Sequence, residues 1–144
     1  SMTDEERWFE SLASRAPNEK PFGIEVRDGD GWRLIGNCTF FDIDAIAHSG
    51  ELGIMIGDKS EWNKGRGTET MNLLLRHGFE TLNLNRIVLR VYADNPRAIR
   101  AYEKAGFKLE GTFREAVFKR GKFGDMHVMS VLRREWDARK KENA

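Results

Sequence analysis

Two glycines separated by a single residue, Gly65 and Gly67, stand directly before a predicted helix. Glycine lets the backbone turn tightly, so that several N–H groups and the positive end of the helix face one anion. About thirty residues later, a second predicted helix begins after Asn95 and carries Tyr102. Its phenol, with an ordinary pKa of about 10, is a protonated donor at neutral pH. Together these residues suggest a pyrophosphate cradle with a hydroxyl-bearing helix beside it, an arrangement that suits a nucleotide-like cofactor.

Two other phosphate-binding loops are excluded by their spacing. The Walker loop needs four residues between its glycines, followed by Lys and Ser or Thr, and Gly65 and Gly67 have one residue between them. The dinucleotide-binding loop needs a third small residue, where this chain has Thr70, and a strand directly before the glycines. Neither loop fits, and the glycine pair alone is equally typical of an ordinary helix start.

Composition excludes several other classes of site. With 144 residues, 40% of them hydrophobic, the chain has the size and the apolar content of one globular domain. The net charge of +1, without a long basic run, gives no sign of a basic surface that would bind a nucleic-acid backbone. Cys38 is the single cysteine, and the histidines at 48, 77 and 127 show no metal-ligand spacing. No apolar run has the length of a membrane span, and no signal peptide is visible. We expect a cytoplasmic, metal-free protein with no nucleic-acid or membrane partner.

Hydrophobic periodicity and turn residues predict the elements that must position Gly65, Gly67 and Tyr102. Asp-Gly steps within residues 27–31 signal a β-hairpin. Before the glycines, the predicted elements are a helix over 4–14, strands over 22–26 and 33–41, a loop over 42–50 and a buried strand over 51–57.

Beyond the glycines, apolar residues recur at intervals of three and four from Met71 to Leu82 and predict one helix. A strand over 86–93 follows. Asn95 as a cap and Pro96 in the first turn begin a second, shorter helix, which stops at Gly106. The remaining predicted elements are strands over 108–119 and 125–132 around a turn at 120–124, and a polar helix through Trp136. Alternation of strands and helices predicts an α/β domain with a crossover connection.

The order of these motifs resembles the GNAT superfamily of acyl-CoA-dependent N-acetyltransferases. Its pattern is Gln/Arg-x-x-Gly-x-Gly/Ala at a helix start and Asn-x-x-Ala-x-x-x-Tyr-x-x-x-Gly-Phe further on. Gly65 and Gly67 fill the glycine positions of the first motif. The second motif is filled at every position, by Asn95, Ala98, Tyr102, Gly106 and Phe107. The resemblance covers roughly residues 22–132.

The resemblance implies a mixed, mostly antiparallel central sheet flanked by helices. In this family the strand predicted over 51–57 splays from the strand over 86–93, and the pantetheine arm of acetyl-CoA lies in the gap, bonded to backbone near Met55, Ile56 and Gly57. Members open with a strand and one or two helices that wall the acceptor site. Because this chain begins inside that region, we expect N-terminal elements of the domain, and part of the substrate wall, to be missing.

The resemblance also implies direct acetyl transfer from a thioester to an amine, which requires a neutral nucleophile and a proton for the departing thiolate. Tyr102 is the expected general acid; alternatively, its ring only packs under the crossover. Glu51 is the candidate base, with Asp42 and Asp44 as alternatives, although a carboxylate at a strand end is also an ordinary structural feature. No covalent intermediate on Cys38 is required.

Cofactor-binding residues are implied in the glycine loop, on the strand before it and on the second helix. Trp62 stands where the family has Gln or Arg, so binding there must rest on backbone groups and on Lys64 or Arg66, which are also compatible with solvated side chains. Arg97 and Arg100 are further candidates for the phosphates. The expected cofactor-binding residues are Met55, Ile56, Gly57, Trp62, Asn63, Lys64, Gly65, Arg66, Gly67, Thr68, Asn95, Ala98, Tyr102 and Lys104.

These observations predict a single N-acetyltransferase domain over residues 1–144 that moves an acetyl group from acetyl-CoA to a primary amine. Residues 110–116 and 125–130 are similar to the branch that acetylates ribosomal-protein N-termini and polyamines. The acceptor is left open among a protein N-terminus, a polyamine and a small amine, because acceptor loops vary on a fixed scaffold.

Two alternatives come from other classes of function. One is a catalytically idle acyl-CoA sensor or interaction module, which would not need Tyr102. The other is a nucleotide-phosphate binder of a different kind. Trp8, Trp32 and Trp136 are candidate core or dimer anchors, so a homodimer is a further expectation.

Overall fold

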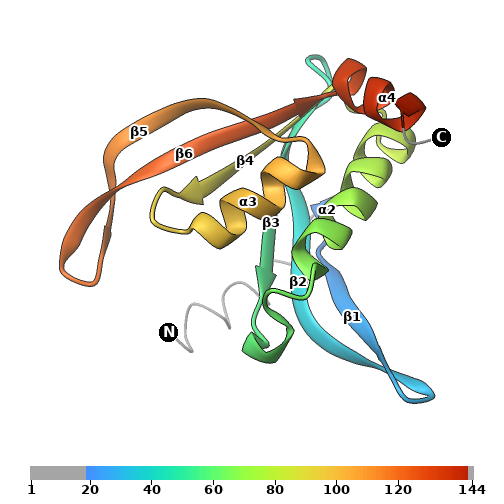
Figure 1. Ribbon diagram of the computed structural model, residues 1–144. Coiled ribbons are helices and arrows are strands. Elements are labelled where there is room, and N and C mark those ends of the chain that lie inside the picture. Colours follow the sequence, from blue (N-terminus) through green and yellow to red (C-terminus); the bar gives the residue numbers. More distant parts are fainter. Residues whose placement is uncertain (1–18, 143–144) are drawn as a thin grey trace.

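A six-stranded sheet with helices packed on one face forms the centre of the fold (Figure 1). The computed structural model describes residues 19–142, so the helix predicted over 4–14 lies outside the described residues. The strands are β1 (Phe22–Asp28), β2 (Gly31–Asp44), β3 (Ser49–Ile56), β4 (Arg86–Tyr92), β5 (Lys108–Lys119) and β6 (Lys122–Leu132). The helices are η2 (Lys59–Glu61), α2 (Arg66–Arg76), η3 (His77–Thr81), α3 (Pro96–Ala105) and α4 (Arg133–Glu142).

The sheet is mixed and mostly antiparallel, as predicted, with the strand order β1-β2-β3-β4-β6-β5. Neighbouring strands run antiparallel except for β3 and β4, which are parallel and are joined through α2. Parallel strands need a crossover connection, and α2 supplies it. The predicted fold class is confirmed.

Several strand boundaries differ from the prediction. Residues 42–50 are not simply a loop, because β2 continues to Asp44, which pairs with Ser49 at the start of β3. The turn predicted over 120–124 is also shorter, because Lys119 already pairs with Lys122. Arg120 and Gly121 both have positive φ, as a two-residue hairpin turn requires. Pairing with a partner strand extends these strands beyond their local patterns.

The helices also differ in detail from their predicted bounds. The helix after the glycines changes at His77 into a π-helical turn that ends at Thr81. The tail helix, α4, extends past Trp136 to Glu142. The indole of Trp136 packs on the ring of Phe79, with the ring centres 5.3 Å apart, so α4 is anchored to the end of the crossover helix.

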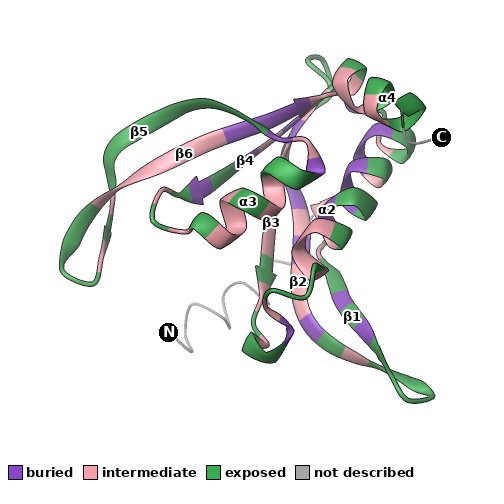
Figure 2. Cartoon of the chain, viewed as in Figure 1, coloured by how far each residue is buried: buried purple, intermediate pink, exposed green. Residues whose placement is uncertain are grey.

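The core lies between the sheet and α2, where buried residues gather (Figure 2). From α2 and η3, Met71, Leu75 and Phe79 are fully enclosed, and they meet Phe40 and Ile87 from the strands. By contrast, β5 is exposed along most of its length. In the part of the chain that the structure describes, no helix is long and apolar enough to cross a bilayer. The core therefore anchors α2 to the sheet through Met71, Leu75 and Phe79.

Candidate active site

The strands β3 and β4 pair for only three residues and then separate. Their pairing ends at Glu51 and Val88, although β3 continues to Ile56 and β4 to Tyr92. Beyond this point, no strand of the described chain pairs with the edge of β3 that faces β4. The splayed pair implied by the family resemblance is present.

The start of α2 has the geometry expected of an anion site. Gly65 precedes the helix with φ 77° and ψ 5°, a left-handed conformation that glycine adopts without strain. Asn63 in the same loop also has positive φ. Within the described residues, no side chain caps this helix. The first N–H groups of α2 are therefore left for a ligand.

The start of α3 is built in the opposite way. Asn95 accepts a hydrogen bond from the backbone N–H of Ala98 through its side-chain oxygen, at 3.3 Å, and Pro96 occupies the first turn. The helix ends at Gly106, which has φ 106°. A Cβ at Gly67 would lie 3.6 Å from the Cβ of Ala101, so the first turn of α2 packs directly on α3. The two helices form two walls of one cleft.

This cleft has a volume of about 520 Å³. Of the residues predicted to bind a cofactor, those that line it are Met55, Ile56, Trp62, Asn63, Gly65, Arg66, Gly67, Thr68, Asn95, Ala98, Tyr102 and Lys104. The structure thus gathers residues from β3, the glycine loop and α3 around one hollow.

Gly57, Lys64 and Glu51 were also predicted as site residues, but they are not among the residues that line the cleft. The N–H of Gly57 donates to the carbonyl of Ile35 at 3.0 Å and is already used within the protein. The ammonium of Lys64 lies 3.8 Å from the carboxylate of Glu61. The backbone contact expected at Gly57 therefore has no free N–H donor.

Cations outnumber carboxylates in the cleft. Among the lining residues of the described chain, Glu61 is the only carboxylate, and the cations are Arg66, Arg97, Arg100, Lys104 and Lys119. Glu61 is 6% exposed and accepts hydrogen bonds from Arg33 at 2.7 Å and Arg66 at 3.2 Å. The hydrogen bonds from Arg66 and Arg33 lower the pKa of Glu61. The remaining positive charge suits a ligand with several phosphates.

Tyr102 lies on α3, half-buried against the core, with its ring 6.0 Å from that of Phe107. Burial raises the pKa of its phenol, and the positive charge of Arg97 opposes this only in part. The phenol therefore keeps its proton at neutral pH, as a general acid must.

Glu51 lies at the last paired position before β3 and β4 separate. Its neighbour Leu52 is buried on the helix side of β3, so the side chain of Glu51 points to the opposite face of the sheet. Its carboxylate is 16% exposed and lies 3.2 Å from the guanidinium of Arg90. Tyr102 and Glu51 thus lie on opposite faces of the sheet, near the opening between the two strands.

The alternative bases, Asp42 and Asp44, lie in the segment before β3. The carboxylate of Asp44 accepts hydrogen bonds from the backbone N–H groups of Ala47 and Ile46, which lower its pKa. Asp42 is exposed. Like Glu51, neither residue lines the cleft.

Sequence reasoning missed five residues of the cleft: Ile54, Glu61, Tyr92, Ala101 and Lys119. Lys119 reaches it because the hairpin of β5 and β6 places its ammonium 3.2 Å from Asp94 and 4.2 Å from the centre of the Tyr92 ring. Glu61 is held by Arg33, which is 28 positions earlier in the chain. No local pattern signals either contact.

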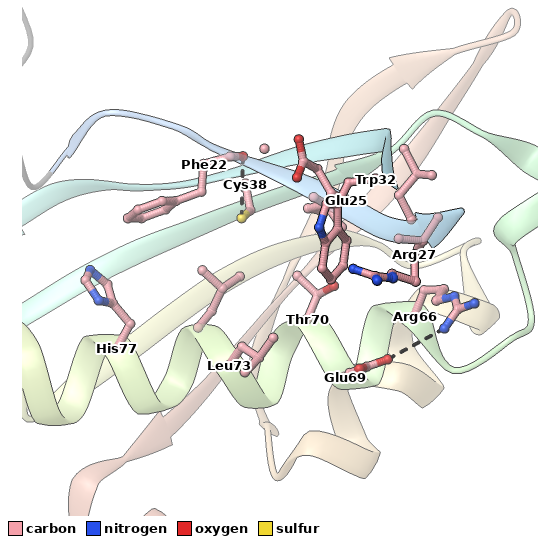
Figure 3. Close-up of a pocket in the computed structure, with 15 residues that line it drawn as sticks. Phe22, Glu25, Arg27, Trp32, Cys38, Arg66, Glu69, Thr70, Leu73 and His77 are labelled. Carbon is pink, nitrogen blue, oxygen red and sulfur yellow. Dashed lines mark hydrogen bonds and ion pairs between the residues drawn. The ribbon is translucent and has the colours of Figure 1, made fainter. Parts of the chain in front are cut away.

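A second, larger hollow of about 700 Å³ lies between β1, β2 and α2 (Figure 3). Its lining includes Phe22, Trp32 and Leu73, and it shares Arg66 with the cleft. There Arg66 lies 3.8 Å from Glu69, which compensates its charge. This hollow is more apolar and lacks the open helix start, so we assign the chemistry to the smaller cleft.

Three structural features of the cleft fit coenzyme A. It combines an uncapped helix start at Gly65, an excess of cations and an unpaired strand edge long enough for an extended arm. Within residues 19–142, no group of three or more His, Cys, Asp or Glu side chains is placed to hold a metal ion.

Comparison with protein families gives a match over residues 1–108 to the acetyltransferase (GNAT) domain. Among curated proteins, the chain is 34% identical over 115 residues to the uncharacterized N-acetyltransferase p20 of Bacillus licheniformis, covering 80% of this chain and 63% of that protein. It is also 34% identical over 103 residues to the spermidine N(1)-acetyltransferase of Vibrio cholerae, covering 72% of this chain and 59% of that protein. The chain thus spans less than two thirds of the length of these relatives.

Solved structures agree with these matches. The structure of spermidine N-acetyltransferase from Vibrio cholerae in complex with CoA and spermine superposes with a TM-score of 0.78 at 31% identity, covering 92% of this chain and 75% of that one. An F149A mutant of the same enzyme gives a TM-score of 0.81 at 30% identity, covering 97% of this chain and 80% of that one. By sequence and by fold, the chain belongs to the GNAT acetyltransferase family.

Proposed function

We propose that this protein is an acetyl-CoA-dependent N-acetyltransferase that transfers an acetyl group directly to a primary amine. The observation that supports this most strongly is that one cleft joins the open helix start at Gly65 with the protonated phenol of Tyr102. A spermidine acetyltransferase among its relatives adds support for an amine acceptor.

The residues present would hold the cofactor by two kinds of contact. The phosphates would accept hydrogen bonds from the first N–H groups of α2 and from Arg97, Arg100 and Lys104. The pantetheine arm would lie along the edge of β3 near Met55, beyond the point where β4 separates from it.

Acetyl-CoA supplies a thioester carbonyl to the cleft. As the C–N bond forms and the C–S bond breaks, one proton must leave the amine and one must reach the thiolate. Tyr102 holds the proton for the thiolate, and Glu51 is the candidate acceptor for the proton of the amine, directly or through water. Cys38 takes no part, because burial raises the pKa of its thiol to about 11 and it lies outside the cleft.

Release of free CoA from acetyl-CoA, measured across a panel of amines, tests this proposal. The panel contains spermidine, free amino acids, an aminoglycoside and peptides with different N-termini, and mass spectrometry identifies the acetylated product. We expect one class of amine to give turnover. Thermal stabilisation by CoA without turnover on any amine would favour the sensor alternative. Equal stabilisation by ATP would favour a general nucleotide-phosphate binder.

The pH dependence of Glu51→Gln tests the assignment of the base. If Glu51 accepts the proton, this variant has a lower kcat and loses the fall in rate on the acidic side of the profile. Asp42→Asn and Asp44→Asn are matched controls from the adjoining segment and should keep that limb. A normal acidic limb in Glu51→Gln would assign the base elsewhere.

A further inference from the structure

Trp62 connects three parts of the cleft. Its indole N–H donates to the carbonyl of Ile56 at 2.9 Å, at the end of β3. The guanidinium carbon of Arg97, in the first turn of α3, lies 3.5 Å from the centre of the indole ring. At this distance the guanidinium is in contact with the face of the ring. One side chain in the glycine loop thus contacts both the end of β3 and the first turn of α3.

Arg97 differs from Arg66 in how its charge is held. Arg66 is positioned by Glu61 and Glu69, and these carboxylates offset its charge. Among residues 19–142, no carboxylate forms an ion pair with Arg97. An aromatic face orients a guanidinium without cancelling its charge, and stacking leaves the N–H groups along its edge free.

We propose that Trp62 is a positioning residue that orients Arg97 to bind a phosphate group of the cofactor. This inference rests on the proposed function. Trp62 stands where the family pattern has a Gln or Arg side chain of its own. In this chain the side chain that binds phosphate is instead Arg97 from α3, and the indole of Trp62 orients its guanidinium. The planar guanidinium has the geometry to bind two phosphate oxygens at once.

Calorimetric titration of the purified chain with CoA, 3′-dephospho-CoA and pantetheine tests the proposal. Arg97→Met should weaken CoA binding about tenfold or more and leave pantetheine, which carries no phosphate, unchanged. Trp62→Leu should reproduce this loss, whereas Trp62→Phe should keep most of the affinity. In the Arg97→Met background, Trp62→Leu should cause little further loss, because the two residues act as one unit.

The 3′-dephospho-CoA titration locates the phosphate. If Arg97 binds the 3′-phosphate, Arg97→Met affects CoA alone; if it binds the pyrophosphate, both ligands are weakened equally. Arg27→Met is the matched control, because Arg27 also stacks on an indole, that of Trp32 at 5.2 Å, outside the cleft. It should leave CoA binding unchanged.

Melting temperatures and circular dichroism establish that each variant is folded. Equal weakening of pantetheine and CoA by Trp62→Leu would overturn the proposal, because the residue would then only shape the cleft. Unchanged CoA affinity in Arg97→Met would overturn it as well. If the unsubstituted chain binds none of the three ligands, the proposed function itself fails, which is a separate outcome.

Discussion

The helices α2 and α3 begin on two sides of the same cleft, but their first turns are built differently. At α2, Gly65 takes a left-handed conformation and no side chain within the described residues caps the helix. At α3, the side chain of Asn95 caps the N–H of Ala98, and Pro96 removes another donor. The first turn of α2 leaves backbone N–H donors for a ligand, whereas the first turn of α3 has a donor satisfied by the side chain of Asn95.

This difference separates a backbone contribution to the cleft from a side-chain contribution. We propose that the first N–H groups of α2 bind phosphates, a contact that depends on the backbone conformation at Gly65 and not on a side chain. The wall formed by α3 contributes side chains: Arg97, Arg100 and Lys104 for charge, and Tyr102 for a proton. Substitution of Tyr102 on α3 should therefore change the chemical step, whereas substitutions before α2 and of Arg97 on α3 should change cofactor affinity.

The largest effect is expected for Tyr102→Phe. We expect kcat to fall by about a hundredfold, because the thiolate loses its proton donor, with the dissociation constant for CoA nearly unchanged. Steady-state kinetics and calorimetry measure the two quantities. Tyr92→Phe is the matched control, because Tyr92 lines the same cleft without lying on α3. Equal kcat values for Tyr102→Phe and the unsubstituted protein would remove Tyr102 from the mechanism.

The pH profile sharpens the same point. Burial raises the pKa of Tyr102, so its proton is present below the usual value of about 10 and is lost only above it. No loss of rate due to Tyr102 is therefore expected between about pH 7 and 9. Arg97→Met should raise the pKa further, because the charge of Arg97 lowers it.

The next effect is expected for Gly65→Ala, which breaks the open start of α2. A side chain at φ 77° strains the loop, and we expect CoA affinity to fall about tenfold as the helix N–H groups lose their alignment. Gly121→Ala is a matched control, because Gly121 has φ 76° in a turn far along the chain, and a Cβ added at either glycine would meet no atom within 4 Å. Both variants should lose about 1 kcal/mol of stability, but only the first should lose affinity.

Substitutions of Asn95 test whether this residue contributes to stability, to CoA affinity or to both. Its Oδ1 is used by the cap, and because Asn95 also lines the cleft we expect its NH₂ group to donate to the cofactor. Asn95→Ala should lower the free energy of unfolding by about 1 kcal/mol, whereas Asn95→Asp should keep it, because Asp is an equally good cap. Both should weaken CoA binding a few-fold. Retention of full affinity in Asn95→Asp would limit Asn95 to the cap.

The smallest effect concerns Glu61, which holds Arg66 beside the start of α2. The hydrogen bonds from Arg66 and Arg33 lower its pKa, so its contribution to stability is present above the ordinary value of about 4.5 and is lost as the pH falls below it. Glu61→Gln should lower the melting temperature at about pH 7. The difference from the unsubstituted protein should shrink below about pH 4.5. A difference that is constant with pH would show that the charge of Glu61 is not involved.

Local sequence signals predicted the elements whose first and last residues include a helix cap or a helix breaker. Asn95, Pro96 and Gly106 bound α3 as expected, because a cap, a first-turn proline and a left-handed glycine act within a few residues. The ends of β2 and β3 were missed, because Asp44 becomes part of a strand only by pairing with Ser49. Strand ends depend on the partner, which no local pattern supplies.

The same distinction holds for the site. The residues of the two motifs could be found because their spacing is fixed by one turn and one helix. Glu61 and Lys119 could not, since they reach the cleft through Arg33 and through the hairpin of β5 and β6. Size alone would favour the larger hollow beside β1, and we propose the smaller cleft because the larger hollow lacks an open helix start.

The most direct test of where the cofactor binds is the change in backbone amide NMR shifts on titration with CoA. We predict the largest changes at residues 63–68 and 95–102, which include both helix starts. Residues 22–32 in the larger hollow should change little. Large changes confined to residues 22–32, with none at 63–68, would contradict the assignment of the cleft between α2 and α3 as the acetyl-CoA site.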